Sequence, residues 1–571
     1  MALRKPELII GLVGAVGTDL SSTKHAIRGT LSYYGYQSVH VRLSRLMQDI
    51  PHGGYLASID DEAARIRCHM DAGDEIRRQA GRNDAVAGLA VGYMNEFRSE
   101  HHGEQPAEGV AFILDSIKHP KEVETLRSVY RNRFILLSVQ SPTNSRKEVL
   151  KRRMARSVGS PERVEDFAGE AGELMDRDEQ DAKNEYGQHV RDAFTEGDIF
   201  VSTQPEEELA GGITRYFKLF FSNPFVTPTM EEYGMFVAHT AGLRTADLSR
   251  QVGAAISTNR GDIVSVGCNE VPRAFGGQYW LGDENDARDF VRGYDSNTKY
   301  RAGALRTAFD RLKEAGQLGA DKEFPDFLDA LKGTRLAGLT EFGRPVHAEM
   351  ASLLDAAKRG VPVEGLTMFA TTFPCHNCAR HIIAAGIREV IYREPYEKSL
   401  AAELHDDAIV VDPSERNETH VVFRRFVGVG PRQYMDLFTK LARKDSRLGN
   451  TKPWSEGMGE PRLITTGSAY LFNEDDFLVE FENSVDRVTL GDLEDSGGPT
   501  HLRPQVENAN APETLEVDPG WLRKSFDRAR TNVSERPFRF RPADQREPGS
   551  VAGTSLSGDP DPETDGSGGS S

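Results

Sequence analysis

Residues 344–383 read RPVHAEMASLLDAAKRGVPVEGLTMFATTFPCHNCARHII. His347 and Glu349 stand two residues apart at the start of an amphipathic helical stretch, whereas Cys375 and Cys378 follow a predicted strand and a proline. Residues three apart share one face of a helix, so both sulfur atoms can reach one ion. Cys375 is expected at a helix N-terminus, where the helix dipole favours the thiolate that a metal needs. These residues predict a metal site with His347, Cys375 and Cys378 as its ligands.

The number of ligands indicates a catalytic metal. Three protein ligands leave the fourth tetrahedral position of zinc for water, and two thiolates cancel the charge of Zn²⁺ while His347 binds as a neutral imidazole. Glu349 is spaced to contact that water without ligating the ion, so it can move a proton from water to a ring nitrogen and to a departing amine. The H-x-E and P-C-x-x-C pattern is the signature of zinc-dependent base deaminases. We therefore predict a zinc-dependent deaminase with Glu349 as its catalytic acid and base.

A structural zinc site is the alternative interpretation of the same residues. In that case Cys375, Cys378 and His347 would be joined by a fourth ligand, for which His376 or His381 is available. Structural sites usually supply four ligands, and a non-ligating carboxylate has no part in them. The position of Glu349 therefore favours the catalytic interpretation.

Outward from the motif, residues 236–440 resemble the cytidine deaminase superfamily and, more narrowly, the deoxycytidylate deaminases. The stretch GDIVSVGCNEVPRAFGGQYW (261–280) is similar to the first core strands of that family, which end in G-x-N-x-x-P, and AAGIREVIY (384–392) is similar to the segment after the zinc helix. The resemblance implies that Asn269 contacts a sugar hydroxyl and that Tyr396 is a substrate-contacting aromatic residue. It also implies an α/β/α cytidine-deaminase-like domain.

The domain boundaries follow from composition and pattern. We expect the zinc-dependent domain over 233–445, with a polar, largely helical insertion at 275–345 that could wall its pocket. The stretch FFSNPFVTPT (220–229) is typical of a linker, which we place at 221–232. An extension over 446–535 contains two or three candidate strands, in RLITTGSAYLF and FLVEF, that would form a small subdomain. The tail over 536–571 is rich in Arg, Pro, Gly and Ser, and such a composition predicts disorder.

The first 220 residues alternate apolar runs with helical stretches. This alternation predicts an α/β domain over 1–220 with a doubly wound parallel sheet. The expected strands are ELIIGLVG (7–14), QSVHVRL (37–43), AFILD (111–115), RFILLSVQ (133–140) and DIFVST (198–203).

A glycine-rich turn, GLVGAVGTDLSS (11–22), lies between the first strand and the first helix, where a phosphate loop belongs. It departs from the Walker A pattern G-x-x-x-x-G-K-[ST], because Thr18 and Asp19 follow Gly17 and no lysine stands there. Loss of this lysine disfavours kinase chemistry. We expect Gly14, Gly17, Thr18 and Asp115 to bind a regulatory nucleotide with Mg²⁺; a purely structural or partner-binding domain is the alternative. Further candidates for phosphate contacts are arginines on a later helix, at positions 146, 152, 153 and 156. The alternative is that these arginines form a solvated basic face of that helix.

The order of the two domains extends the resemblance. A P-loop nucleotide-kinase-like domain with a degenerate Walker A, followed by a deaminase, resembles the bacterial antiphage deoxycytidylate deaminases. That family converts dCTP and dCMP to dUTP and dUMP and so drains the cytosine deoxynucleotides that a phage needs. The resemblance implies a deoxynucleotide substrate, a homo-oligomer and control by a small regulatory RNA or a phage-derived trigger.

Composition limits the remaining classes of function. The formal net charge of -18 argues against a protein that grips a nucleic-acid backbone, although a deaminase acting on a base in RNA or DNA remains the enzymatic alternative, and an inactive nucleotide-sensing protein the other. Arg260 and Arg273 are candidate phosphate contacts near the predicted hairpin. The chain has four cysteines and no visible disulfide framework, and no stretch approaches the roughly 18 apolar residues of a membrane span. These features predict a cytoplasmic protein without a membrane anchor.

Overall fold

The structure is a computed structural model that describes residues 5–536. Within this range it leaves out 180, 182, 183, 320, 333, 397, 398, 414–417, 456, 458, 465, 466 and 491–519. Nearly all of the tail predicted to be disordered, 537–571, lies outside the described residues. The described chain builds two six-stranded sheets.

The first sheet has the strand order β12-β5-β4-β1-β3-β2. Its strands are β1 (Leu8–Val13), β2 (Gln37–Arg42), β3 (Val110–Asp115), β4 (Phe134–Gln140), β5 (Ile199–Ser202) and β12 (Gly428–Val429). The first five run parallel, as predicted, and β12 joins antiparallel to β5. Alternate residues of β1 face different cores, Ile9 and Val13 on one side and Ile10 on the other, because successive strand side chains point to opposite faces.

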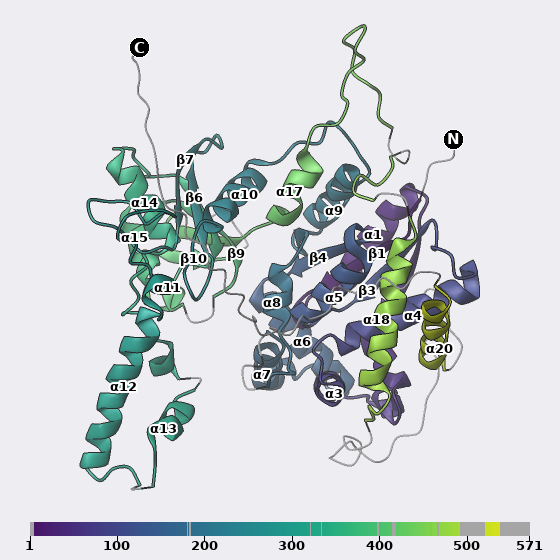
Figure 1. The fold of residues 1–571 in the computed structure, drawn as a ribbon, viewed down its shortest axis with the longest axis horizontal. Helices are drawn as coiled ribbons and strands as arrows, with labels where there is room; N and C mark the ends of the chain where they lie inside the picture. The colour runs from purple at the N-terminus through teal and green to yellow at the C-terminus, as the bar shows by residue number, and fades with distance from the viewer. Residues whose placement is uncertain are drawn as a thin grey trace, which may run out of the picture.

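Helices cover both faces of this sheet (Figure 1), as a doubly wound fold requires. They are α1 (Leu20–Tyr33), α2 (Leu43–Leu46), α3 (Glu62–Ala80), α4 (Ala85–His102), α5 (Pro120–Tyr130), α6 (Thr143–Ser157), α7 (Ala168–Glu179), α8 (Val190–Thr195) and α9 (Glu206–Phe220). Short 3₁₀ turns complete the unit: η1 (Met47–Asp49), η2 (Gly53–Ser58), η3 (Arg131–Arg133) and η4 (Val164–Phe167). Helices α1 and α9 pack together on the face opposite α4.

The second sheet has the order β10-β11-β9-β8-β6-β7. Its strands are β6 (Gly253–Ser257), β7 (Ile263–Cys268), β8 (Thr367–Thr372), β9 (Glu389–Glu394), β10 (Ile409–Val411) and β11 (Val421–Arg425). The hairpin β6–β7 and the β6–β8 pair are antiparallel, and the remaining pairs are parallel. Its helices are α10 (Met230–Gly242), α14 (Ala348–Lys358), α15 (His376–Ala384), α16 (Ala401–Leu404) and α17 (Pro431–Phe438).

This sheet lies between two helical layers. Ala255 and Phe369 share a core with Met235 of α10, whereas Ile256 and Met368 share another with Leu353 of α14. The stretch expected as a helical insertion, 275–345, contains α11 (Asp289–Arg292), α12 (Ser296–Glu314), α13 (Phe324–Ala330) and η5 (Arg335–Gly338). Figure 1 shows α12 and α13 projecting away from the sheet. None of the helices that the structure describes has the length and hydropathy to cross a bilayer.

The prediction of strands in RLITTGSAYLF and FLVEF is wrong. The region forms helix α18 (Ala469–Val485), and a second helix, α20 (Trp521–Ser534), follows. The buried side chains of α18 recur every three or four residues, which is the helical period and not the period of two of a strand. They include Tyr470, Glu474, Leu478, Phe481 and Val485. Both helices pack against α4 of the first unit, so this extension covers that unit instead of forming a separate β subdomain.

The segment expected as a linker, 221–232, is anchored at both of its ends. Phe221 is buried and stacks on Tyr34 of α1, while Glu232 accepts hydrogen bonds from Arg215 at 2.6 Å and from the backbone of Val429 at 2.8 Å. Residues from both sheets also share one hydrophobic cluster.

Candidate metal centre and catalytic pocket

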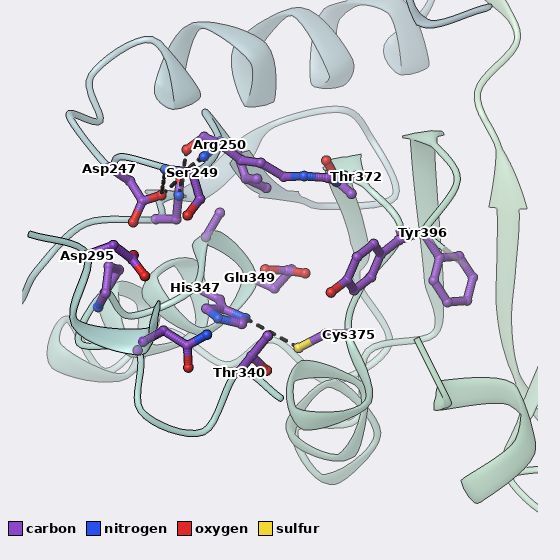
Figure 2. Close-up of a pocket in the computed structure, with 17 residues that line it drawn as sticks. Asp247, Ser249, Arg250, Asp295, Thr340, His347, Glu349, Thr372, Cys375 and Tyr396 are labelled. Atoms are coloured by element: carbon purple, nitrogen blue, oxygen red, sulfur yellow. Dashed lines mark hydrogen bonds between the residues drawn. The ribbon is translucent and has the colours of Figure 1, made fainter. Parts of the chain in front are cut away.

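Two helix N-termini bring the predicted metal ligands together. His347 is the N-cap of α14, Cys375 is the N-cap of α15, and Cys378 lies in the first turn of α15. The Nδ1 atom of His347 lies 3.3 Å from the Sγ of Cys375 and 3.4 Å from the Sγ of Cys378, and all three atoms lie within 4.8 Å of one another. Figure 2 shows His347 and Cys375 facing each other at the base of a pocket. The predicted convergence of one nitrogen and two sulfur atoms is therefore confirmed.

The donor set fits a zinc ion. The pKa of the Cys375 thiol falls to about 4, chiefly because Cys378 and then His347 hydrogen-bond to it, and the pKa of His347 rises to about 9 because it bonds to Cys375. The Cys378 thiol, which donates to Cys375, has a raised pKa. Protons thus balance the charge of these ligands, and a divalent cation can replace those protons. Neither His376 nor His381, the two candidates for a fourth ligand, belongs to the donor group that the described residues form.

Glu349 lies beside this group without belonging to it. Its side chain is 4% exposed and comes from the first turn of α14, and its Oε2 atom lies 3.6 Å from the Sγ of Cys378. Burial raises the pKa of the carboxyl to about 6. A carboxyl with a pKa near neutrality, next to a metal site, can both accept and release a proton.

The pocket above the metal ligands has a volume of about 290 Å³. One wall is the loop between α10 and β6, which contributes Asp247, Ser249 and Arg250, and the opposite wall includes Thr372 and Tyr396. The insertion closes a third side with Asp295, Asn297, Thr340 and Gly343. The expectation that the insertion walls the pocket is therefore confirmed.

Asn269 lines the pocket and also holds its wall in place. Its side-chain oxygen accepts the backbone N–H of Val252 at 2.8 Å, and its side-chain NH₂ donates to the backbone carbonyl of Arg250 at 2.8 Å. The amide therefore fixes the loop that carries Arg250, while one further proton and one lone pair stay available for a ligand.

Tyr396 lines the pocket on the side facing this loop. In Figure 2 its hydroxyl points into the same space as Glu349, and the Arg250 side chain extends across the top of that space. The Arg250 guanidinium lies 5.3 Å from the centre of the Tyr396 ring, a cation–π distance. Burial raises the pKa of the Tyr396 hydroxyl.

Arg250 is the pocket residue that sequence reasoning missed. The candidates Arg260 and Arg273 do not line the cavity, and Arg273 pairs with Asp283 on an exposed loop at 3.2 Å. Arg250 sits in the polar run TADLSRQ, which has no motif or spacing that separates it from other surface arginines. Its position depends on the hydrogen bonds of Asn269, which the sequence does not reveal.

The four residues predicted for the N-terminal site line a second cavity of about 220 Å³. These residues are Gly14, Gly17, Thr18 and Asp115. Gly17 has a φ of +85°, and a Cβ atom there would lie 2.7 Å from the carbonyl oxygen of Arg146, so only glycine fits. Of the later arginines, Arg146 is buried and contacts the loop, whereas 152, 153 and 156 are exposed and do not line the cavity.

Asp115 has cationic partners of its own. It accepts hydrogen bonds from Lys24 at 2.6 Å and from His40 at 3.2 Å. Burial alone would raise its pKa, but these two partners hold the pKa of Asp115 below its ordinary value. In the described structure the carboxylate is therefore neutralised by Lys24.

The part of the chain that contains the candidate metal site is similar to a known protein family. Residues 228–394 match the model of the family described as the cytidine and deoxycytidylate deaminase zinc-binding region. ComE operon protein 2 of Bacillus subtilis is 40% identical over 77 residues, which are 13% of this chain and 41% of that protein. Deoxycytidylate deaminase of Enterobacteria phage T2 is 43% identical over 54 residues, 10% of this chain and 29% of that protein. The chain thus spans less than half of each of these relatives.

A longer match covers most of a relative at lower identity. Human deoxycytidylate deaminase is 27% identical over 218 residues, 38% of this chain and 90% of that protein. Among solved structures, dCMP deaminase of cyanophage S-TIM5 in complex with dCMP and dUMP aligns over 35% of this chain and 100% of that chain, with 18% identity and a TM-score of 0.21. The sequence matches support the cytidine and deoxycytidylate deaminase superfamily for this region.

Proposed function

We propose that the protein is a zinc-dependent deaminase of deoxycytidine nucleotides, converting dCTP, dCMP or both to the uracil nucleotides and ammonia. The observation that carries this proposal is the buried, non-ligating Glu349 beside the His347, Cys375 and Cys378 donor group, at the base of a walled pocket. A zinc ion held by those three residues supplies the Lewis acidity that lowers the pKa of water. The similarity to deoxycytidylate deaminases supports the choice of base.

Glu349 performs the proton transfers. Water adds its oxygen to C4 of cytosine while Glu349 takes one of its protons, and Glu349 delivers that proton to N3. The second proton of the water reaches the amino group, again through Glu349, and ammonia leaves as the C4 carbonyl forms. The raised pKa of about 6 supports this cycle, because a carboxyl that binds and releases protons near neutrality fits both steps.

The pocket wall supports a nucleotide with a phosphate. Arg250 can donate charge-assisted hydrogen bonds to phosphate oxygens, which are among the stronger hydrogen bonds in proteins. We propose Asn269 as the sugar contact and Tyr396 as an aromatic substrate contact, since both line the same cavity.

The net charge of -18 and the pocket wall contributed by the insertion favour a free nucleotide over a base in RNA or DNA, because polymer deaminases need a basic groove. The acid–base residue Glu349 argues against an inactive nucleotide-sensing protein.

For the whole chain we propose a P-loop nucleotide-kinase-like domain over 1–220 and a deaminase domain over 233–445, joined at 221–232. The strand order β5-β4-β1-β3-β2 supports the P-loop-like fold, and the glycine loop beside the 220 Å³ cavity is the feature from which we propose a regulatory nucleotide with Mg²⁺ at the first domain. The fused domain order supports a role in antiviral defence by depletion of cytosine deoxynucleotides. A cytoplasmic homo-oligomer controlled by a small RNA or a phage-derived trigger belongs to the same proposal.

The test is ammonia release by the purified, zinc-loaded protein. The substrates are dCMP, dCTP, CMP, CTP, deoxycytidine and single-stranded DNA, each with and without ATP, dTTP and GTP. We expect turnover of the deoxynucleotides alone. Turnover of single-stranded DNA alone would show that the protein is a nucleic-acid deaminase. No turnover of any substrate by the zinc-loaded protein would contradict the proposal.

A further inference from the structure

The glycine loop between β1 and α1 binds a side-chain carboxylate of the protein itself, that of Asp178. The backbone N–H of Val16 donates to Oδ2 of Asp178 at 2.6 Å, and Nζ of Lys118 donates to Oδ1 of Asp178 at 2.8 Å. The Asp178 side chain, at the end of α7, is fully buried. Backbone N–H groups of such a loop and a nearby ammonium group are the donors that bind phosphate oxygens. Asp178 therefore occupies the position that a phosphate group would take.

Space for a larger ligand adjoins this carboxylate. Asp178 forms part of the wall of the 220 Å³ cavity, together with the loop residues Gly14 to Thr18. Arg42 and Arg65 line the same cavity. A cavity with a phosphate-type loop at one end and arginines in its wall suits a polyphosphate ligand.

Unpartnered polar atoms lie on the other side of the loop. A small cavity of about 30 Å³ contacts Thr18, Gln140, Arg146 and Arg425. Within the described residues, the Oγ1 of Thr18, the Oε1 of Gln140 and the Nε of Arg146 are buried without a hydrogen-bond partner, whereas the Nε of Arg425 lies 3.3 Å from Oδ2 of Asp412. Buried polar groups normally have partners, so three such atoms around one cavity mark a place where the arrangement of groups can change.

The end of α7 connects this cavity to the catalytic pocket. Glu179, next to Asp178, accepts a hydrogen bond from Arg146 at 2.5 Å and lines the same small cavity as Arg425 of β11. Pro395 lines the same small cavity, and its neighbour Tyr396 lines the catalytic pocket. One helix end therefore contacts the glycine loop and borders the same small cavity as the segment that carries a catalytic-pocket residue.

We propose that the Asp178 carboxylate occupies the phosphate-binding position of the glycine loop and that a polyphosphate ligand binds by displacing it. The displaced end of α7 then acts through Glu179, Arg146 and Arg425 on the Pro395–Tyr396 segment. Displacement breaks the hydrogen bond from Val16 and frees Lys118 for the ligand. The effect on turnover rests on the proposed deaminase function, whereas the displacement itself does not.

The first test measures binding of Mg–ATP to the zinc-loaded, full-length protein by calorimetry, with saturating dUMP present to fill the catalytic pocket. Asp178→Asn keeps the size of the side chain but removes the competing charge, so we expect Mg–ATP to bind about tenfold more tightly than to the unmodified protein. The matched control is Asp176→Asn, an exposed position on the same helix, which should bind as the unmodified protein does. Equal or weaker binding by Asp178→Asn, or no binding by either protein, would overturn the proposal.

A second measurement does not require a variant of Asp178. Hydrogen exchange of the unmodified protein should show peptides over 14–18 becoming protected and peptides over 168–179 exchanging faster when Mg–ATP is added. Binding of Mg–ATP with unchanged exchange over 168–179 would contradict displacement even if Asp178→Asn failed to fold.

The coupling to the catalytic pocket is tested with Glu179→Gln. Mg–ATP should change the KM for dCMP about fivefold or more in the unmodified protein. In Glu179→Gln this change should disappear while Mg–ATP still binds. If the protein deaminates no substrate, the proposed function fails, and the coupling is then read from exchange over 389–396, which Mg–ATP should alter. Unchanged KM and unchanged exchange there would overturn the coupling.

Discussion

Arg250 shares its pocket wall with two carboxylates. Among the described residues that line the catalytic cavity it is the one arginine or lysine, and Asp247 and Asp295 stand near it. Burial, and then the neighbouring charges of Asp295 and Glu270, raise the pKa of Asp247 despite two backbone hydrogen bonds. A phosphate entering this pocket therefore meets one permanent positive charge, and its binding depends on that charge.

Replacement of Arg250 by Met should weaken phosphate binding specifically. A charge-assisted hydrogen bond contributes about 1.5–3 kcal/mol, so the KM for dCMP should rise roughly 10- to 100-fold. The KM for deoxycytidine, which lacks the phosphate, should stay nearly constant, and Arg250→Lys should restore part of the loss. Steady-state kinetics with both substrates gives the comparison.

Arg273→Met serves as the control, because Arg273 is exposed and lies outside the pocket. Its KM values should match those of the unmodified protein. An equal rise in KM for dCMP and deoxycytidine in Arg250→Met would show that Arg250 holds the loop and does not bind phosphate.

The sequence predicted that the donor atoms of His347, Cys375 and Cys378 converge, because each set lies at the start of a helix. His347 caps one helix and Cys375 and Cys378 begin another, so helix geometry alone brings each set of donors to a helix start. Sequence analysis did not predict Arg250 as a pocket residue, because its position depends on Asn269. The Asn269 side chain hydrogen-bonds to backbone groups 17 and 19 residues earlier in the chain. Such a contact has no periodic signal in a single sequence.

At the scale of elements, His119 begins α5 as a cap that works only when it is neutral. Its Nδ1 atom accepts the backbone N–H of Lys121 at 3.1 Å, and Glu122 completes the capping box. Burial, followed by the charge of Arg77, lowers the pKa of His119 to about 3. A pKa below the unfolded value of about 6.5 means that protonation favours the unfolded chain. The stability from this cap is present above pH 6.5 and is lost as the pH falls towards 3.

The unfolding free energy should therefore decrease between pH 7 and pH 5, by about 1 kcal/mol from His119 once partial screening by solvent is allowed for. His119→Asn keeps a capping acceptor that does not titrate, so its stability should change less over this range. Urea unfolding at both pH values measures the difference. His25→Asn, at an exposed position on α1, should keep the slope of the unmodified protein. Equal slopes in His119→Asn and the unmodified protein would refute the assignment.

Elements were predictable from sequence where their pattern was local. All five parallel strands of the first sheet lie where the sequence predicted them. Four of them, β1, β3, β4 and β5, are nearly continuous apolar runs because they are buried on both faces, whereas the edge strand β2 alternates buried and more exposed residues. Helix α18 was mistaken for strands because FLVEF is a short apolar run with a single acidic residue, and so short a run does not separate a strand from a buried helix. In the fold Glu474 and Glu482 on this helix are buried, so charge did not mark its exposed face.

At the scale of the whole molecule, the chain returns to its first unit after completing the second. Glu474 of α18 is fully buried, accepts hydrogen bonds from Arg98 of α4 and from Asn95 at 3.0 Å, and accepts the hydroxyl of Tyr130 at 2.7 Å. Arg98 also pairs with Glu7 at 2.8 Å. This network ties residues more than 300 positions apart in the chain.

Glu474→Ala should destabilise the first unit by about 3 kcal/mol, because it leaves a buried guanidinium with one carboxylate partner in place of two. Urea unfolding followed by circular dichroism measures the loss. Glu480→Ala on the exposed side of the same helix should cost less than about 0.5 kcal/mol. Similar small losses in both variants would mean that α18 is not part of the cooperative unit.

The proposed proton-transfer role of Glu349 links the candidate metal centre, the pocket and the proposed activity. The measurement that tests it most directly combines zinc content, by mass spectrometry, with the rate of ammonia release from dCMP in Glu349→Gln. The account predicts zinc bound as in the unmodified protein and a rate lower by about 10³-fold, with Glu364→Gln on an exposed loop as the unaffected control. Turnover that persists in Glu349→Gln with zinc bound would contradict the account.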